Sequence, residues 1–176
     1  MRKDQINPMP DYFDRYINLV PDTNLSNALA DSLETLRGLD MNLLKAIGTQ
    51  TYAPDKWSVN DILQHITDTE RVFCYRVLRF ARKDNTATAG YDENQFALYA
   101  QAGKRELIDI LDELSIVRMG TIALFKSFDE EALLQKGICW KYEMSVLAMG
   151  FTLVGHQMHH FNVMQTKYYP LAETKA

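Results

Sequence analysis

Cysteine is scarce in this 176-residue sequence, which contains only Cys74 and Cys139. Two widely separated cysteines cannot build the disulfide framework of a small secreted domain or a Cys-rich zinc site. Neither has the basic sequence neighbours that mark a reactive thiolate, so we interpret both as packing residues. This usage is typical of a reducing compartment, and we therefore expect a cytoplasmic protein.

Long apolar runs are missing as well. A membrane-spanning helix needs about 18 apolar residues, and the longest candidate, residues 144–154, is shorter and rich in small side chains. The N-terminal stretch MRKDQINPMPDYF has no apolar core behind its basic start, so it lacks the pattern of a secretory signal. We expect no membrane partner.

Positive charge is not in excess. The chain has 19 Lys and Arg against 23 Asp and Glu, a formal net charge of −4 with neutral histidine, and a pI of about 5.5. A nucleic-acid-binding domain or a protein that binds anionic membranes needs a basic surface. The charge balance therefore argues against nucleic acid as a partner and favours a small-molecule substrate or another protein.

Strand patterns are nearly absent. Residues 136–142 come nearest to an alternating pattern and are expected to pair as a short ribbon at most. Four long segments carry a helical period instead, with Pro and Gly almost entirely between or before them. They are residues 25–47, 59–82, 104–128 and 145–168, the last stopped by Pro170, and a further short helix is expected within residues 11–20.

These patterns predict an all-α protein with the architecture of a four-helix bundle. We expect one domain over residues 1–176, in which residues 1–22 form an N-terminal extension. Ser58 and Asp61 have the spacing of a capping box, so the second long helix is expected to begin directly after Ser58. Residues 83–103 are longer than an ordinary bundle connection and should be functional or contain a short helix.

Histidine residues are few, and three of the four lie within five positions. The four are His65, His156, His159 and His160. Because each helical residue advances by about 100°, His156 and His160 lie about 40° apart on one face. This face is the apolar stripe of the fourth segment, which also contains Met149, Leu153 and Met164. His65 lies on the inward face of the second segment, so three imidazoles are expected to point into one bundle.

Two interpretations of these imidazoles are open. A single histidine on an apolar face is usually a core residue satisfied by a hydrogen bond. Three together have too few acceptors in an apolar interior unless a cation binds their neutral nitrogens. We therefore favour a metal site with His65, His156 and His160 as ligands, which suits Zn, Ni, Fe or Co and leaves a position for water or substrate. His159 is rotated by about 100° and is expected beside the site or on the surface.

Five other residues are candidates for a role near this site. Glu70 and Arg76 either line a pocket or form a solvated or interface ion pair. Arg118 interrupts the apolar stripe of the third segment, so it either pairs with a buried acid or lines the metal cavity. Tyr91 and Asp92 either form a lid or belong to a loop that packs passively on the bundle. The spacing of the residues identifies no general base.

Several motifs together resemble the DinB-like superfamily. The matching positions are KWS at 56–58, HITDTER at 65–71, YR at 75–76, AR at 81–82, GYD at 90–92 and GHQMHH at 155–160. The resemblance spans about residues 25–169. Its most specific part is one histidine in the second helix combined with the GHxxHH motif in the fourth.

The resemblance implies a four-helix bundle that holds a divalent metal, usually zinc or nickel, through three histidines, often in a homodimer. The ligands carry over onto His65, His156 and His160. Characterised relatives include bacillithiol S-transferases and a mycothiol-dependent maleylpyruvate isomerase, in which the metal holds the thiol as thiolate. We accordingly expect a metal-dependent thiol S-transferase or hydrolase, with a low-molecular-weight thiol as a candidate cosubstrate. The alternative is a noncatalytic metal-binding or stress-response protein with a structural metal.

Overall fold

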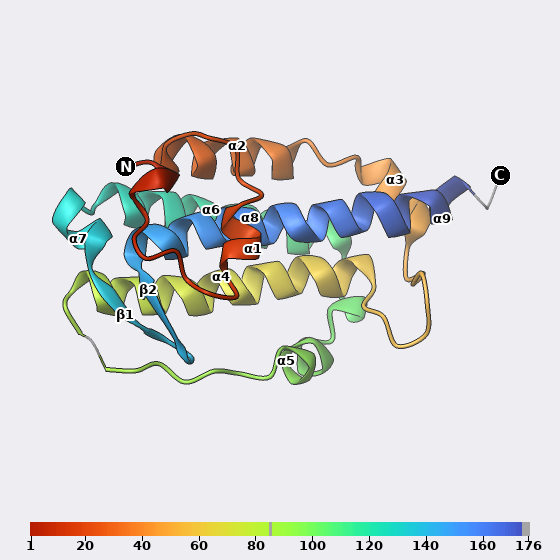
Figure 1. Ribbon diagram of the computed structural model, residues 1–176. Helices are drawn as coiled ribbons and strands as arrows, with labels where there is room; N and C mark the ends of the chain where they lie inside the picture. Colours follow the sequence, from red (N-terminus) through yellow and green to blue (C-terminus); the bar gives the residue numbers. More distant parts are fainter. Residues whose placement is uncertain (85, 174–176) are drawn as a thin grey trace.

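Four long helices lie side by side along the molecule in the computed structural model, which describes residues 1–84 and 86–173 (Figure 1). They are α2 (Leu25–Arg37), α4 (Val59–Ala81), α6 (Leu107–Lys126) and α8 (Val146–Val163). Helix α4 contacts α6 and α8, and α2 contacts the same two helices, so each helix has two neighbours in the bundle. The predicted all-α four-helix bundle is confirmed.

The first predicted helix, residues 25–47, is wrong as a single element. It is divided into α2 and α3 (Met41–Ile47), and the break falls at Gly38–Asp40. The Asp40 side chain accepts hydrogen bonds from the backbone N–H groups of Asn42 and Leu43, so it caps a new helix. Apolar residues on both sides of the break are buried, and the period therefore continues across it.

Helix α4 begins where its cap predicts. The backbone N–H of Asp61 donates to Ser58 Oγ over 3.3 Å, and the backbone N–H of Ser58 donates to Asp61 Oδ2 over 2.9 Å. This reciprocal capping box satisfies donors at the helix start that have no partner within the helix. It sets the beginning of α4 about two turns before His65.

The connections between the long helices contain small elements. The predicted functional or helical connection at residues 83–103 contains α5 (Glu93–Ala100), followed by a 3₁₀ turn, η2 (Ala102–Lys104). The expected ribbon is an antiparallel pair of β1 (Lys136–Cys139) and β2 (Tyr142–Ser145), in which Lys136 is opposite Ser145, and α7 (Glu130–Leu134) precedes it. The N-terminal residues form η1 (Lys3–Gln5) and α1 (Asp14–Ile17), the latter within the predicted range 11–20.

The sequence pattern predicts that the last helix ends before Pro170, but the helix continues past this residue. Helix α8 passes into a π-helical segment, η3 (Met164–Tyr168), and then into α9 (Tyr169–Glu173). Pro170 stands in the first turn of α9, where a backbone N–H has no acceptor within that helix. A proline is therefore tolerated at this position.

The core consists of two apolar clusters separated along the bundle axis by polar side chains. On α4, one cluster contains Ile66 and the other contains Phe73, with the buried Glu70 between them. The other three helices show the same order. We call the buried polar residues at this level the polar layer: Ser32, Glu70, Arg118, Thr121 and Gln157.

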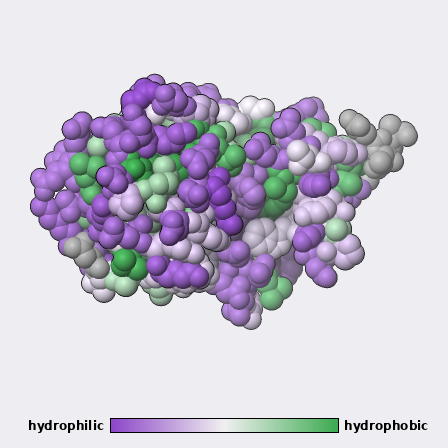
Figure 2. Space-filling model, in the orientation of Figure 1, coloured by the Kyte–Doolittle hydropathy of each residue, from purple (hydrophilic) through white to green (hydrophobic). Residues whose placement is uncertain are grey.

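The surface in Figure 2 is predominantly hydrophilic, with hydrophobic residues in small groups. Within the described part of the chain, no helix combines the length and the apolar character needed to cross a bilayer.

Candidate metal centre

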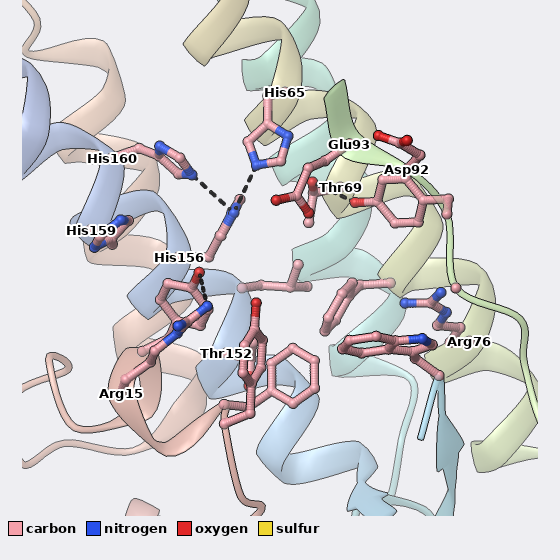
Figure 3. A pocket seen from close by; sticks show the side chains of 18 of the residues that line it. Arg15, His65, Thr69, Arg76, Asp92, Glu93, Thr152, His156, His159 and His160 are labelled. Atoms are coloured by element: carbon pink, nitrogen blue, oxygen red, sulfur yellow. Dashed lines mark hydrogen bonds between the residues drawn. The ribbon is translucent and has the colours of Figure 1, made fainter. Parts of the chain in front are cut away.

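Three imidazoles meet at the level of the polar layer. We call His65 from α4 and His156 and His160 from α8 the histidine triad. The Nε2 atom of His156 lies 3.1 Å from Nε2 of His65 and 3.1 Å from Nε2 of His160 (Figure 3). The ligand atoms of all three lie within 4.8 Å of one another, with His65 and His156 buried and His160 half-buried. The structure thus brings together the three histidines that the sequence analysis selected.

Hydrogen bonds alone satisfy this arrangement poorly. Nε2 of a neutral imidazole carries either one hydrogen or one lone pair and makes one well-directed hydrogen bond, but His156 Nε2 faces two nitrogens. Zn–N bonds of about 2.0–2.1 Å in a tetrahedral site place neighbouring nitrogens roughly 3.3 Å apart, close to the spacing here. The triad therefore fits a single divalent cation.

Burial keeps the triad in the form that binds metals. Burial lowers the pKa of His65 to about 4 and that of His160 to about 3, the latter with a contribution from His65 and His159. Burial and then the neighbouring His160 and His65 hold the pKa of His156 well below its ordinary value. Because only neutral imidazole is a ligand, the three side chains are ready to bind a cation at neutral pH.

The N-terminal segment covers the triad, a contact that the sequence patterns do not predict. Helix α1 crosses α8 at Gly155, where an added Cβ would lie 1.9 Å from the carbonyl oxygen of Tyr16. The Tyr16 ring packs edge-on against His156 and His159, with centroid distances of 5.3 and 5.5 Å. A glycine inside a helix, directly before His156, is the one sequence signal of this close approach.

A cavity of about 530 Å³ lies against the triad. Its walls are largely aromatic and come from α1, the loops and the β-hairpin as well as the long helices: Tyr12, Tyr16, Trp57, Phe73, Tyr91 and Trp140. The two acidic residues on its wall are Asp92 and Glu93, at the start of α5. Tyr12, Tyr16, Trp140 and Glu93 were missed, because they lie in short elements or turns that only the folded chain brings to the triad.

A model of the DinB superfamily matches residues 24–164, which is most of the chain. The chain belongs to the DinB superfamily. A solved structure, YfiT from Bacillus subtilis, is described as a probable metal-dependent hydrolase with an unusual four-helix bundle topology. It is similar with a TM-score of 0.66 and 15% identity, over 93% of this chain and 87% of that chain, so the likeness establishes the fold. No curated protein matches the sequence.

The remaining candidates of this DinB-superfamily chain differ in their relation to the cavity. His159 lines it but is exposed and lies outside the triad, and its pKa is lowered by burial and by Arg15. Tyr91 also lines the cavity, and its hydroxyl is 2.8 Å from that of Thr69. Asp92 accepts hydrogen bonds from two backbone N–H groups of α5, so it caps that helix.

Glu70 and Arg118 pair with each other in the interior. Nε and Nη2 of Arg118 donate to Oε1 and Oε2 of Glu70, both over 2.7 Å, and the residues are 0% and 1% exposed. Arg118 also donates to Ser32, and Thr121 donates to Glu70 Oε1 over 2.6 Å. Arg118 thus pairs with a buried acid, and Glu70 is part of this interior ion pair and not among the residues that line the cavity.

Arg76 is buried and lines the cavity. Its Nη2 donates to the carbonyl oxygen of Ala89 over 2.6 Å, and its Nη1 donates to Cys139 Sγ over 3.3 Å. Cys139 therefore contacts a guanidinium, but burial outweighs this contact and raises the pKa of its thiol. Burial raises the pKa of Cys74 to about 11, in agreement with a packing role for both cysteines.

Proposed function

We propose that this protein is a metal-dependent enzyme of the hydrolase or thiol S-transferase kind, with His65, His156 and His160 holding one zinc or nickel ion. The observation that carries the proposal is the convergence of three neutral Nε2 atoms beside an open cavity. A metal ion with a purely structural role is usually bound by four protein ligands. Within the described residues, the triad has no fourth histidine, cysteine or carboxylate in its cluster.

A divalent cation held by three histidines lowers the pKa of a water or thiol at its free position and so supplies a nucleophile at neutral pH. The chain's own residues prepare the surroundings. The aromatic walls and the N-terminal segment limit the access of water to the triad, which strengthens electrostatic interactions there. In Figure 3 the Glu93 side chain lies on the same cavity as the triad, and we propose it as the acceptor of a proton released there.

The choice between water and thiol as nucleophile can be tested with cobalt-substituted protein. We expect a saturable sulfur-to-cobalt charge-transfer absorption when 2-mercaptoethanol or bacillithiol is added, because a dication favours the thiolate. The absorption should be absent in His160→Ala. Metal content is measured after the titration, since a thiol can also extract the ion. If cobalt stays bound and no thiol changes the spectrum, the S-transferase proposal is wrong and hydrolysis remains.

A further inference from the structure

The guanidinium of Arg76 is a buried cation without an anionic partner. Arg76 is 4% exposed and lies in the wall of the cavity that contains the triad, on the same helix as His65 (Figure 3). Its recorded hydrogen-bond acceptors, the Ala89 carbonyl and the Cys139 thiol, are uncharged. Among the described residues, no carboxylate oxygen lies within 4.0 Å of its nitrogens, including those of Asp92 and Glu93 on the same wall.

A buried guanidinium in this state is costly. Removing a cation from water is compensated fully only when an anion and further hydrogen bonds replace its hydration, and the cation–π contacts of Arg76 with the Phe73 and Tyr91 rings supply a smaller attraction than a counter-ion would. The same bundle satisfies this requirement at Arg118, which has a bidentate carboxylate partner. A guanidinium has five N–H donors, and these two hydrogen bonds of Arg76 use one on Nη1 and one on Nη2. Donors therefore remain for an acceptor that enters the cavity.

The walls around Arg76 suit an apolar body attached to that acceptor. The rings of Phe73 and Tyr91 have their centroids 5.4 and 5.9 Å from Arg76 Cζ. Trp140 packs on the backbone at Gly90, where an added Cβ would lie 2.6 Å from its Cδ1 atom. Trp140 is the first residue of the two-residue turn between β1 and β2, and its φ of 59° is the conformation that such a turn needs there, so the hairpin fixes the ring in the wall.

We propose that Arg76 binds the carboxylate of the substrate, so that the substrate class is small organic carboxylates with an apolar or aromatic body. The planar fork of a guanidinium matches a carboxylate in a bidentate arrangement. The carboxylate binds at Arg76, the body contacts the aromatic walls, and the reacting group is directed to the triad. The inference rests on the proposed function in one respect, which is that this cavity is the substrate site. Carboxylate binding itself needs no metal.

The test uses metal-free protein and two probes of the same shape, 3-phenylpropionate and 3-phenylpropionamide. Trp57 and Trp140 are the chain's two tryptophans and both line the cavity, so their fluorescence reports binding. We expect the wild-type protein to bind the carboxylate at least about tenfold more tightly than the amide, because charge-assisted hydrogen bonds are stronger than neutral ones. The preference should fall to less than about twofold in Arg76→Met and be partly kept in Arg76→Lys.

The matched control is Arg79→Met, three residues further on α4. Arg79 pairs with Asp84 and does not line the cavity, so this variant should keep the full preference. A thermal melt with and without the carboxylate shows whether each variant folds. The carboxylate should raise the melting temperature of the wild type and of Arg79→Met, and leave that of Arg76→Met unchanged.

Three results would overturn the inference: no saturable response to the carboxylate, equal binding of the amide by the wild type, or an undiminished preference in Arg76→Met. If Arg76→Met does not fold, the wild-type comparison and Arg76→Lys decide. Metal binding by the same wild-type preparation is measured separately. A carboxylate preference in a protein that binds no metal contradicts the proposed function alone, and metal binding without the preference contradicts the inference alone.

Discussion

Two arginines are buried in this bundle, and their surroundings are opposite. Arg118 lies in the polar layer, where it donates to Glu70 and Ser32, and Thr121 donates to the same Glu70 carboxylate. Arg76 lies about one and a half turns along α4 from Glu70 and faces a cavity without a carboxylate partner among the described residues. A buried charge that is paired within the chain contributes to the structure, whereas a buried charge without a counter-ion needs an anion from outside the chain.

The same difference appears on a single turn of α8. His156 contributes to the open triad, while the next residue, Gln157, belongs to the closed polar layer and donates to the Ser32 carbonyl over 2.8 Å. The polar layer is not satisfied at every atom, since Gln157 Oε1 is buried and, in the described part of the chain, has no hydrogen-bond partner. The bundle thus separates a structural polar region from a binding region by the direction of neighbouring side chains.

Breaking the closed network should have the largest effect on stability. Glu70→Gln removes the negative charge and leaves Arg118 buried without a counter-ion, so we expect a loss of about 3–5 kcal/mol in the free energy of unfolding. Arg76→Met removes a charge that has no counter-ion and should change this free energy by less than about 1 kcal/mol. Urea denaturation of both variants measures the difference. Equal losses would show that the two arginines are not distinct.

Acid should weaken the metal-free protein through the open triad. Burial lowers the pKa of His65 to about 4, against about 6.5 in the unfolded chain, so between these values only the unfolded chain takes up the proton. The stabilising contribution of neutral His65 is therefore complete above pH 6.5 and is lost as the pH falls toward 4. We expect a loss of roughly 2 kcal/mol at pH 5 relative to pH 7 from this group. Urea denaturation of wild type and His65→Phe at both pH values checks it, and an identical pH dependence in the two proteins would contradict the assignment.

The cover over the triad should be sensitive to one methyl group. Gly155→Ala places a Cβ where the Tyr16 carbonyl lies, so α1 must move, and we expect a loss of about 1–3 kcal/mol in unfolding free energy. Gly120→Ala is the control in another long helix. No atom lies within 4 Å of an added Cβ there, and this variant should gain about 0.5–1 kcal/mol from helix propensity. A gain in both variants would mean that the close contact at Gly155 does not hold in solution.

The sequence was sufficient for the start of α4 and for the direction of the triad, for identifiable reasons. Ser58 and Asp61 form a local cap, and local interactions can be recognised without the fold. His156 and His160 lie on a continuous apolar stripe, so their direction follows from helical geometry.

The remaining features depend on contacts between distant parts of the chain. Arg118 interrupts an apolar stripe in the same way whether it pairs with an acid or faces a cavity, and only the position of Glu70 on α4 decides. The division of α2 from α3 is hidden because buried apolar residues continue the period through the break. Tyr16 and Glu93 reach the cavity from short elements whose place is set by tertiary packing.

Metal binding by the histidine triad is tested by measuring metal content with mass spectrometry after exposure to zinc or nickel and removal of the excess. We expect one ion per chain in the wild type and in His159→Ala, because His159 lies outside the triad cluster. We expect at least about a tenfold loss of bound metal in His65→Ala, His156→Ala and His160→Ala, since each removes one of three ligands. Full metal content in these three variants, or none in the wild type, would show that the triad is not the metal site.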